Sequence, residues 1–325
     1  MNRIQTPWCN AARAIFVAVL IATAGACRPT DGLAVDPVSI QTKPIAIEIA
    51  RFEKNTADGV EYSVWLGKPD GEVWYQHSAD RVRPAASAIK TAILIEFFVA
   101  QIESLDHPFD AMNAILDNPD SPAIRHFNAE QKTDVQKELR GLTARQLAEA
   151  MIHKEHIESN AAYNAAANVI IEYLGGPAAL TERVRQRFPA APGLQIARYM
   201  LADRKENADN LLTAESLATV LRFLALHTPP DELRAATRNV LLLETDAERG
   251  DHYYKGGTLT SDPQVRIEAG FWDYRDAAFV YVVIATRPRA ASSAEDFEQL
   301  RSNLSELSQI VQSAGIRLRD VAAPR

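Results

Sequence analysis

A serine and a lysine three residues apart stand at the beginning of a predicted helix. Ser87 and Lys90 belong to Pro84–Phe98 (PAASAIKTAILIEFF), where proline and small residues precede apolar residues at helical spacing. Side chains three positions apart share one face of a helix. Ser87 therefore offers a nucleophilic hydroxyl, Lys90 an amine able to take its proton, and the helix N-terminus a positive dipole near both. The alternative is an ordinary helix start with a solvated lysine, because such pairs occur often by chance.

A second polar feature is a lysine followed by two glycines on a predicted strand, Lys255-Gly256-Gly257-Thr258. Glycine weakens a strand and often marks a place where a ligand or another backbone comes close. A β-bulge is the alternative interpretation of the two glycines.

The third feature is Asn164, in the run NAAANVIIEYLGGP. We expect it to begin a helix with its amide free to point into a cleft, and a plain N-cap is the alternative. His153 and His156 lie three apart on a predicted helix, without cysteine or further ligands at motif spacing. We therefore expect a solvated helix face there, with no metal and no cofactor.

The predicted strands on either side of these residues are expected to form one sheet from both ends of the chain. Strand candidates at 61–66 and 72–76 precede Ser87, and others at 252–260, 265–274 and 278–286 follow a long, nearly all-helical block. Neither set of strands alone would bury its faces, so the two sets must pair. The sequence predicts an α/β (α+β) domain over 45–322, with sheet parts at 45–80 and 250–322 and an inserted helical part at 81–249.

Local signals mark several elements of this domain. Thr143 and Gln146 form a capping box that predicts a helix start, and Gly175-Gly176-Pro177 predicts a helix end. Helices are also expected from Ile45 and over 293–315. Residues 106–127 and 189–210 show little periodicity and are predicted to be irregular.

The N-terminal segment has the pattern of an export signal. Arg3 and Arg13 supply positive charge, and Ala14–Ala26 is apolar but too short to span a bilayer. Small residues before Cys27 resemble a bacterial lipoprotein signal, so lipidation of Cys27 would anchor the protein to a membrane; cleavage after Ala26 with an incidental cysteine is the alternative. We expect a signal peptide at 1–26, a polar tether at 27–44, and a periplasmic or membrane-anchored protein.

Composition limits the partners. The chain has 325 residues, 47% hydrophobic and 24% charged, which is ordinary for a globular protein. A net charge of −7 argues against nucleic acid as a partner. Its two cysteines, Cys9 and Cys27, leave no pair for a disulfide once the signal is removed. We expect a monomer that acts on a small molecule.

Taken in order and spacing, the three features resemble the serine β-lactamase and penicillin-binding protein superfamily, most closely the class A β-lactamases. The resemblance runs from about Ile45 to Gly315. It implies a β-lactamase/transpeptidase-like fold, with a five-stranded antiparallel sheet flanked by helices and a large inserted helical region.

The resemblance also implies roles. Ser87 would be the acylated nucleophile, Lys90 would help deprotonate it, and Asn164 would stand in the middle loop of the site. Lys255 would attract the substrate carboxylate. The backbone N–H groups of Ser87 and Thr258 would form the oxyanion hole, and Gly257 would let the substrate lie along the strand.

Three departures from the family pattern affect function. Ala162 replaces the serine that passes a proton to the leaving nitrogen, and Ser159 is a candidate substitute. Gly256 replaces a hydroxyl residue of the strand, which Thr258 could supply instead. The glutamate that activates the deacylating water is missing, and Glu206 and Asp209 are the available carboxylates.

Three functions therefore stand as alternatives. The first is an exported serine hydrolase that opens β-lactam amides through an acyl-enzyme on Ser87. The second is a DD-peptidase or penicillin-binding protein with slow deacylation, which acts on peptidoglycan stem peptides. The third is a non-catalytic lipoprotein that keeps the fold as a binding module.

Overall fold

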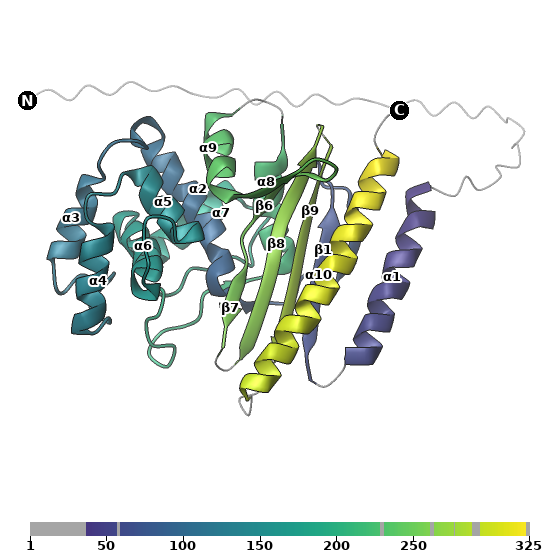
Figure 1. Ribbon diagram of the computed structural model, residues 1–325, viewed down its shortest axis with the longest axis horizontal. Coiled ribbons are helices and arrows are strands. Elements are labelled where there is room, and N and C mark those ends of the chain that lie inside the picture. The colour runs from purple at the N-terminus through teal and green to yellow at the C-terminus, as the bar shows by residue number, and fades with distance from the viewer. Residues whose placement is uncertain are drawn as a thin grey trace, which may run out of the picture. The chain divides into compact units, whose positions relative to one another are not determined.

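The centre of the fold is an antiparallel sheet that the two ends of the chain build together (Figure 1). A computed structural model describes residues 37–56, 59–227, 231–260, 263–275, 277–287 and 293–322. The predicted export signal, Cys27 and the first part of the tether lie outside these residues.

Seven strands form the main sheet among the residues described. They are β1 (Glu61–Gly67), β2 (Val73–His77), β5 (Leu242–Asp246), β6 (Gly250–Tyr254), β7 (Gly257–Leu259), β8 (Gln264–Tyr274) and β9 (Ala277–Arg287). Their order is β2-β1-β9-β8-β6-β5, and β7 also pairs with β8. Strand β9 lies at the centre because its β-branched and aromatic run is buried on both faces.

The predicted fold class and antiparallel pairing are confirmed, with two strands more than the five expected. The single strand expected over 252–260 is divided at Lys255-Gly256 into β6 and β7, which both pair with β8. Strand β5 follows directly on a helix and is mostly exposed. It lacks the alternating pattern by which a half-buried strand is recognised.

Helices cover one face of the sheet and surround a buried central helix. This helix, α2 (Lys90–Gln101), is buried over Lys90–Phe98, as expected for a helix that is apolar on all sides. A 3₁₀ turn, η1 (Ala86–Ile89), leads into it, and η2 (Ile102–Ser104) follows it. The surrounding helices are α3 (Asp110–Asp117), α4 (Ala129–Leu139), α5 (Ala144–His153), α6 (Asn160–Tyr173), α7 (Gly176–Arg187), α8 (Ala214–Ala225) and α9 (Glu232–Leu241).

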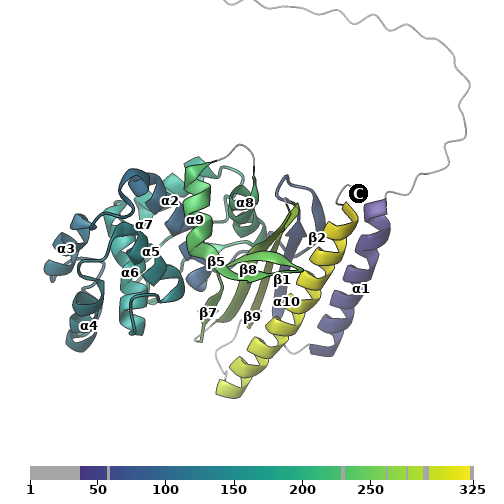
Figure 2. The same ribbon diagram turned by 45° about the horizontal axis from the view of Figure 1, so that its top comes forward.

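Two long helices from opposite ends of the chain cover the other face of the sheet. Figures 1 and 2 show α1 (Pro37–Thr56) and α10 (Ala294–Ala322) side by side there, away from the helical block. Ile49, Phe52 and Leu304 pack with Tyr281 of β9 in a separate apolar core. Helix α1 begins eight residues before the expected start at Ile45. No helix of the described ranges is long and apolar enough to cross a membrane.

The sequence correctly predicted a helix start where a side chain caps the helix. The capping box at Thr143 is confirmed, since Thr143 Oγ1 accepts a hydrogen bond from Gln146 N at 3.2 Å. Residues 189–210 contain no helix, as expected, and end at β4 (Leu211–Leu212), which pairs with β3 (Arg83–Pro84). The prediction that 106–127 is irregular is wrong at α3, whose short apolar face the flanking prolines obscured.

Candidate active site

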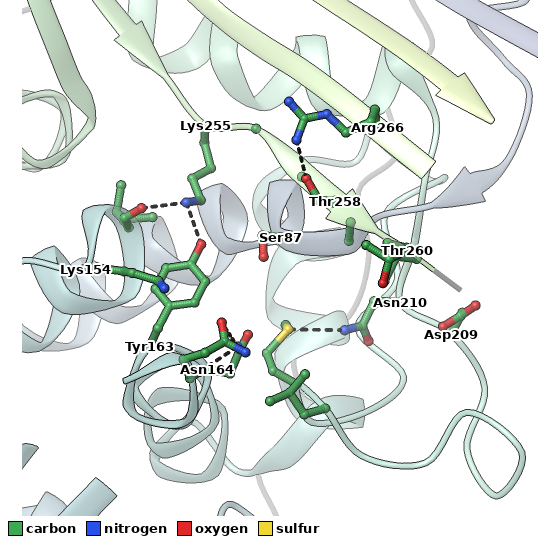
Figure 3. A pocket seen from close by; sticks show the side chains of 18 of the residues that line it. Ser87, Lys154, Tyr163, Asn164, Asp209, Asn210, Lys255, Thr258, Thr260 and Arg266 are labelled. Carbon is green, nitrogen blue, oxygen red and sulfur yellow. Dashed lines mark hydrogen bonds between the residues drawn. The ribbon is translucent and has the colours of Figure 1, made fainter. Parts of the chain in front are cut away.

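A cavity of about 720 Å³ lies where η1, α6, β7 and the loop over residues 198–210 meet. It brings together six of the predicted site residues, which are Ser87, Asn164, Asp209, Lys255, Gly257 and Thr258. Figure 3 labels all of them except Gly257. These residues come from four distant parts of the sequence, so the cavity exists only when the sheet and the helical block are joined.

Ser87 lies in the first turn of the predicted helix, as expected. It is the second residue of η1, and its half-buried side chain lines the cavity. The preceding residue, Ala86, has φ +45°, a left-handed conformation that is uncommon for a residue with a Cβ. Such local strain is found often at functional sites, where the surrounding structure holds it in place.

Gly257 is explained by the close approach of β7 to the turn that carries Ser87. A Cβ at Gly257 would lie 3.0 Å from Ala88 N and 3.1 Å from Ser87 N. Any side chain there would press on the backbone N–H groups of Ser87 and Ala88. Within the part described, β7 pairs along one edge with β8, and its residues line the cavity. An extended ligand could therefore lie along β7.

Lys90 is completely buried beneath the cavity. Its Nζ donates a hydrogen bond to Tyr163 O at 3.1 Å and lies 3.2 Å from the centroid of the Tyr163 ring. Burial holds the pKa of Lys90 well below its ordinary value, and the charges of Lys255 and Lys154 lower it further. A neutral amine can take a proton from a neighbouring hydroxyl, which is what the acylation of Ser87 requires.

No hydrogen bond joins Lys90 Nζ to Ser87 Oγ in the described part of the chain. Catalytic hydrogen bonds are often long without substrate and tighten in the complex, so this geometry does not remove Lys90 as a base.

Lys255 is held at the end of β6 with its amino group directed into the cavity. Its Nζ donates to Ile152 O at 2.6 Å and to the Tyr163 hydroxyl at 2.9 Å. Figure 3 shows the Tyr163 ring reaching from α6 towards this amino group. The two bonds fix the position of the Lys255 charge while leaving it at the cavity wall.

Asn164 lines the cavity from inside α6. The expectation that it begins the helix is wrong, because Ser159 is the N-cap and accepts a hydrogen bond from Ala162 N at 3.0 Å. Asn164 lies one turn later, and its Nδ2 donates to Asn160 O at 2.9 Å. Ser159 is used by the cap and is not among the residues that line the cavity.

The two candidate carboxylates of the loop differ in position. Asp209 lines the cavity, but its Oδ1 accepts hydrogen bonds from Arg198 Nη2 at 3.1 Å and from Arg204 Nε at 2.9 Å. Glu206 is exposed and does not line the cavity. The structure therefore brings only one of the two to the site, and there it is part of an ion-pair cluster.

Met200 occupies the part of the loop that lines the cavity near Asn164. Its backbone is fixed by Asn168, whose Oδ1 accepts from Met200 N at 2.5 Å and whose Nδ2 donates to Met200 O at 3.1 Å. Leu201 and Ala202 follow it along the wall. These apolar side chains offer no base to a water molecule.

Sequence reasoning missed three residues of the site, Tyr163, Lys154 and Arg266. Arg266 lies opposite Thr258 in the β7–β8 register, and its Nη1 donates to Thr258 Oγ1 at 2.6 Å. Lys154 ends α5 in a left-handed conformation with its Nζ 5.4 Å from the Tyr163 ring centroid. With Lys255, these cations give the cavity a positive character that suits an anionic ligand.

The two histidines do not act together. His153 Nε2 lies 2.7 Å from Val240 O, whereas His156 Nε2 lies 2.9 Å from Glu149 Oε2. Among the residues described, the atoms of Glu149, Glu155 and His156 that could hold a metal come within 4.8 Å of one another. Exposed acidic groups gather often without a metal, and we assign none.

The chain is similar to known proteins over most of its length. A family model described as the β-lactamase enzyme family matches residues 44–312. No curated protein matches the sequence. Solved structures with the same fold include an ancestral class A β-lactamase, at 21% identity and TM-score 0.57, which covers 83% of this chain and 99% of that one.

Two other solved structures extend the comparison. A class A β-lactamase from Mycobacterium abscessus is 20% identical with TM-score 0.56, covering 86% of this chain and 100% of its own. An L158E mutant of PBP-A, solved as an acyl-enzyme complex with penicillin G, is 21% identical with TM-score 0.55, covering 85% and 96%. At these identities the likeness concerns the fold.

Proposed function

This chain belongs to the β-lactamase enzyme family, and we propose that it is an exported serine hydrolase that opens β-lactam amides through an acyl ester on Ser87. One observation carries the proposal. A fully buried lysine with a lowered pKa, Lys90, stands behind a serine that faces a cavity of positive character.

In the proposed reaction, neutral Lys90 takes the proton of Ser87 as the Ser87 oxygen attacks the amide carbonyl. Negative charge develops on the carbonyl oxygen beside the junction of η1 and β7. The N–H groups of Ser87 and Thr258 are the proposed donors to it, since fixed dipoles in a site of this kind stabilise an oxyanion strongly. Asn164 would contact the acyl side chain from α6.

The substrate is proposed to carry a carboxylate. Lys255 lies at the cavity wall, and the hydrogen-bonded pair of Arg266 and Thr258 lies farther along β7. A guanidinium and a hydroxyl side by side suit a carboxylate, because each can donate a hydrogen bond to one of its oxygens. β-Lactams and peptidoglycan stem peptides both carry such a group.

The test is covalent labelling of the intact protein with a fluorescent penicillin, followed by intact mass. We expect one penicilloyl adduct on the wild-type protein and none on the Ser87→Ala variant. Ser159→Ala, which removes a serine outside the cavity, is the matched control and should be labelled. Wild-type protein that gains no adduct at millimolar penicillin would disprove the proposal and favour a non-catalytic binding module.

A second candidate is a DD-peptidase or penicillin-binding enzyme that releases its acyl group slowly. It is favoured by the loop, where Met200 lines the cavity and Asp209 is bonded to Arg198 and Arg204. Neither Asp209 nor the exposed Glu206 is placed to activate water. Steady turnover of a chromogenic cephalosporin would favour the β-lactamase, and an adduct that persists for hours would favour the peptidase.

The cellular setting belongs to the same proposal. The apolar segment before Cys27 supports export, and lipidation of Cys27 would anchor the protein to a membrane. We propose that it acts as a monomer on a small molecule rather than on nucleic acid. Metabolic labelling with a clickable fatty acid, compared between wild type and Cys27→Ser, tests the anchor.

A further inference from the structure

Tyr163 stands between the lysines of the cavity. Its hydroxyl accepts a hydrogen bond from Lys255 Nζ at 2.9 Å, and its ring lies 3.2 Å from Lys90 Nζ, measured to the centroid. Lys154 Nζ lies 5.4 Å from the same centroid. Figure 3 shows the hydroxyl directed towards Lys255 on the Ser87 side of α6. One phenol is thus in contact with the two lysines that flank the nucleophile.

Opening an amide requires a proton for the nitrogen that leaves, because an amide anion is a very poor leaving group. The residue before Tyr163 is Ala162, which has no proton to give. Ser159 caps α6 and does not line the cavity. Another group on the cavity wall can supply this proton.

Other cavity-lining groups that could carry a proton are less suited. The Thr258 hydroxyl accepts a hydrogen bond from Arg266 and is paired with it as a donor to the substrate carboxylate, and Asp209 is a carboxylate that accepts hydrogen bonds from two guanidinium groups. Burial raises the pKa of Tyr254 to about 12, which makes it a weak acid. Tyr163 differs from all three, because its hydroxyl accepts a hydrogen bond from the Lys255 ammonium, which can return a proton to it.

We propose that the Tyr163 hydroxyl protonates the leaving nitrogen when Ser87 is acylated. This inference rests on the proposed function and adds a catalytic residue to it. Tyr163 would take this step in place of the hydroxyl that Ala162 lacks.

The protons balance within the site. Ser87 gives its proton to neutral Lys90 as its oxygen bonds to the carbonyl carbon. As the C–N bond breaks, its electron pair stays on nitrogen, which takes the phenol proton of Tyr163. The Lys255 ammonium then returns a proton to the phenolate along the 2.9 Å hydrogen bond. The two lysines together hold as many protons after the step as before it.

The experiment compares leaving groups in a Tyr163→Phe variant, which keeps the ring beside Lys90 and removes only the hydroxyl. Acylation by penicillin G is measured by intact mass against acylation by a phenylacetylglycyl thioester, whose thiolate leaves without a proton. We expect the penicillin rate to fall by about 100-fold or more, the range for loss of a general acid. The thioester rate should change by less than about threefold, because this leaving group needs no acid.

Tyr254→Phe is the matched control, since it removes the other cavity-lining tyrosine hydroxyl and should leave the ratio of the two rates unchanged. An equal fall with both substrates, or an unchanged penicillin rate, would overturn the role of Tyr163. Wild-type protein acylated by neither substrate would instead overturn the proposed function.

Reaction with the thioester also shows that the variant is folded. If Tyr163→Phe does not fold, a fluorinated tyrosine at position 163 replaces it. This side chain keeps the shape but is a stronger acid, so the loss of penicillin acylation at high pH should begin at lower pH. An unmoved alkaline limb would overturn the inference.

Discussion

The cavity has one wall made of helices and strands and another made of the loop over residues 198–210, and the two use their polar groups differently. At one wall, Lys90 begins the buried helix α2, Lys255 lies between β6 and β7, and the amino groups of both contact Tyr163. On the other wall, the loop uses its polar groups to hold its own shape. Asn210 Oδ1, for example, accepts hydrogen bonds from Ala197 N at 2.8 Å and from Arg198 N at 3.0 Å.

The difference separates two halves of the proposed reaction. The helix-and-strand wall has the groups that the proposal assigns to the acylation of Ser87, and regular structure fixes their positions. The loop wall lacks a free base, because its cavity-lining carboxylate is tied to arginines and its nearest side chains are apolar. Formation and release of an acyl-enzyme should therefore respond to mutations in different regions.

The largest effect is expected at Lys90. Lys90→Met should lower the rate of Ser87 acylation by penicillin about 1,000-fold, within the range for loss of a general base. Stopped-flow quenching with a fluorescent penicillin measures this rate. A rate within tenfold of wild type would show that another group deprotonates Ser87.

The same substitution should stabilise the fold. Below the ordinary pKa of lysine, Lys90 is protonated in the unfolded chain. On folding, Lys90 must either release this proton or be buried as a charge, and both cost stability. Methionine removes this penalty, and Tm at neutral pH should rise by at least about 2 °C, the shift produced by 1 kcal/mol. The gain should shrink as pH rises towards the ordinary lysine pKa. A lowered Tm at neutral pH would contradict a destabilising effect of the buried amine.

A second change would supply the loop wall with the base it lacks. Met200→Glu places a carboxylate on the cavity side of a backbone already fixed by Asn168, where it could activate water. We expect release of the penicilloyl group to become about 100-fold faster, with little change in acylation. Loss of the adduct with time, followed by mass, measures release. Met200→Gln has the same shape without the base and should release at the wild-type rate.

A third change tests whether Asp209 serves structure rather than chemistry. Asp209→Asn leaves Arg198, only 8% exposed, without its charged partner and should lower the free energy of unfolding by about 2–3 kcal/mol. Urea unfolding measures this loss, and the acylation rate should change far less. Glu206→Gln, on the same loop but exposed, should change neither quantity. A large fall in release with unchanged stability would make Asp209 the base after all.

The smallest effect is expected at Lys154, which affects Lys90 only through its charge. Its charge helps to lower the pKa of Lys90, so Lys154→Gln should raise that pKa. Because acylation needs neutral Lys90, the acid limb of the acylation rate should move to higher pH. Lys154→Arg keeps the charge and should leave the limb in place. An unmoved limb in Lys154→Gln would show that this charge is screened.

Sequence alone predicted the wall whose residues follow regular spacing. Ser87 and Lys90 are recognisable from their helical spacing of three residues. Gly257 is recognisable as a glycine within a strand, and it lies where β7 approaches the turn that carries Ser87. The order of strands around an inserted helical block was also predictable, because two short sets of strands cannot bury their faces alone.

The parts that sequence missed depend on contacts without a local pattern. Tyr163 lies between Ala162 and Asn164 without a pattern of its own, and only the fold shows that its hydroxyl accepts a hydrogen bond from Lys255. The sequence pattern favoured a helix start at Asn164 because it did not identify Ser159, five residues earlier, as the N-cap. The partners of Asp209 depend on the folded shape of the loop, which brings Arg204 to this carboxylate.

The pairing of β1 with β9 sets an order on folding. Glu61 of β1 lies opposite Thr286 of β9 in the middle of the sheet. Strand β1 therefore cannot pair with β9 until nearly the whole chain is present. Contacts between such distant residues form slowly, because a long loop must close before they contribute. In the proposed export, the chain would remain unfolded until its C-terminal strands had crossed the membrane, which is the state that translocation requires.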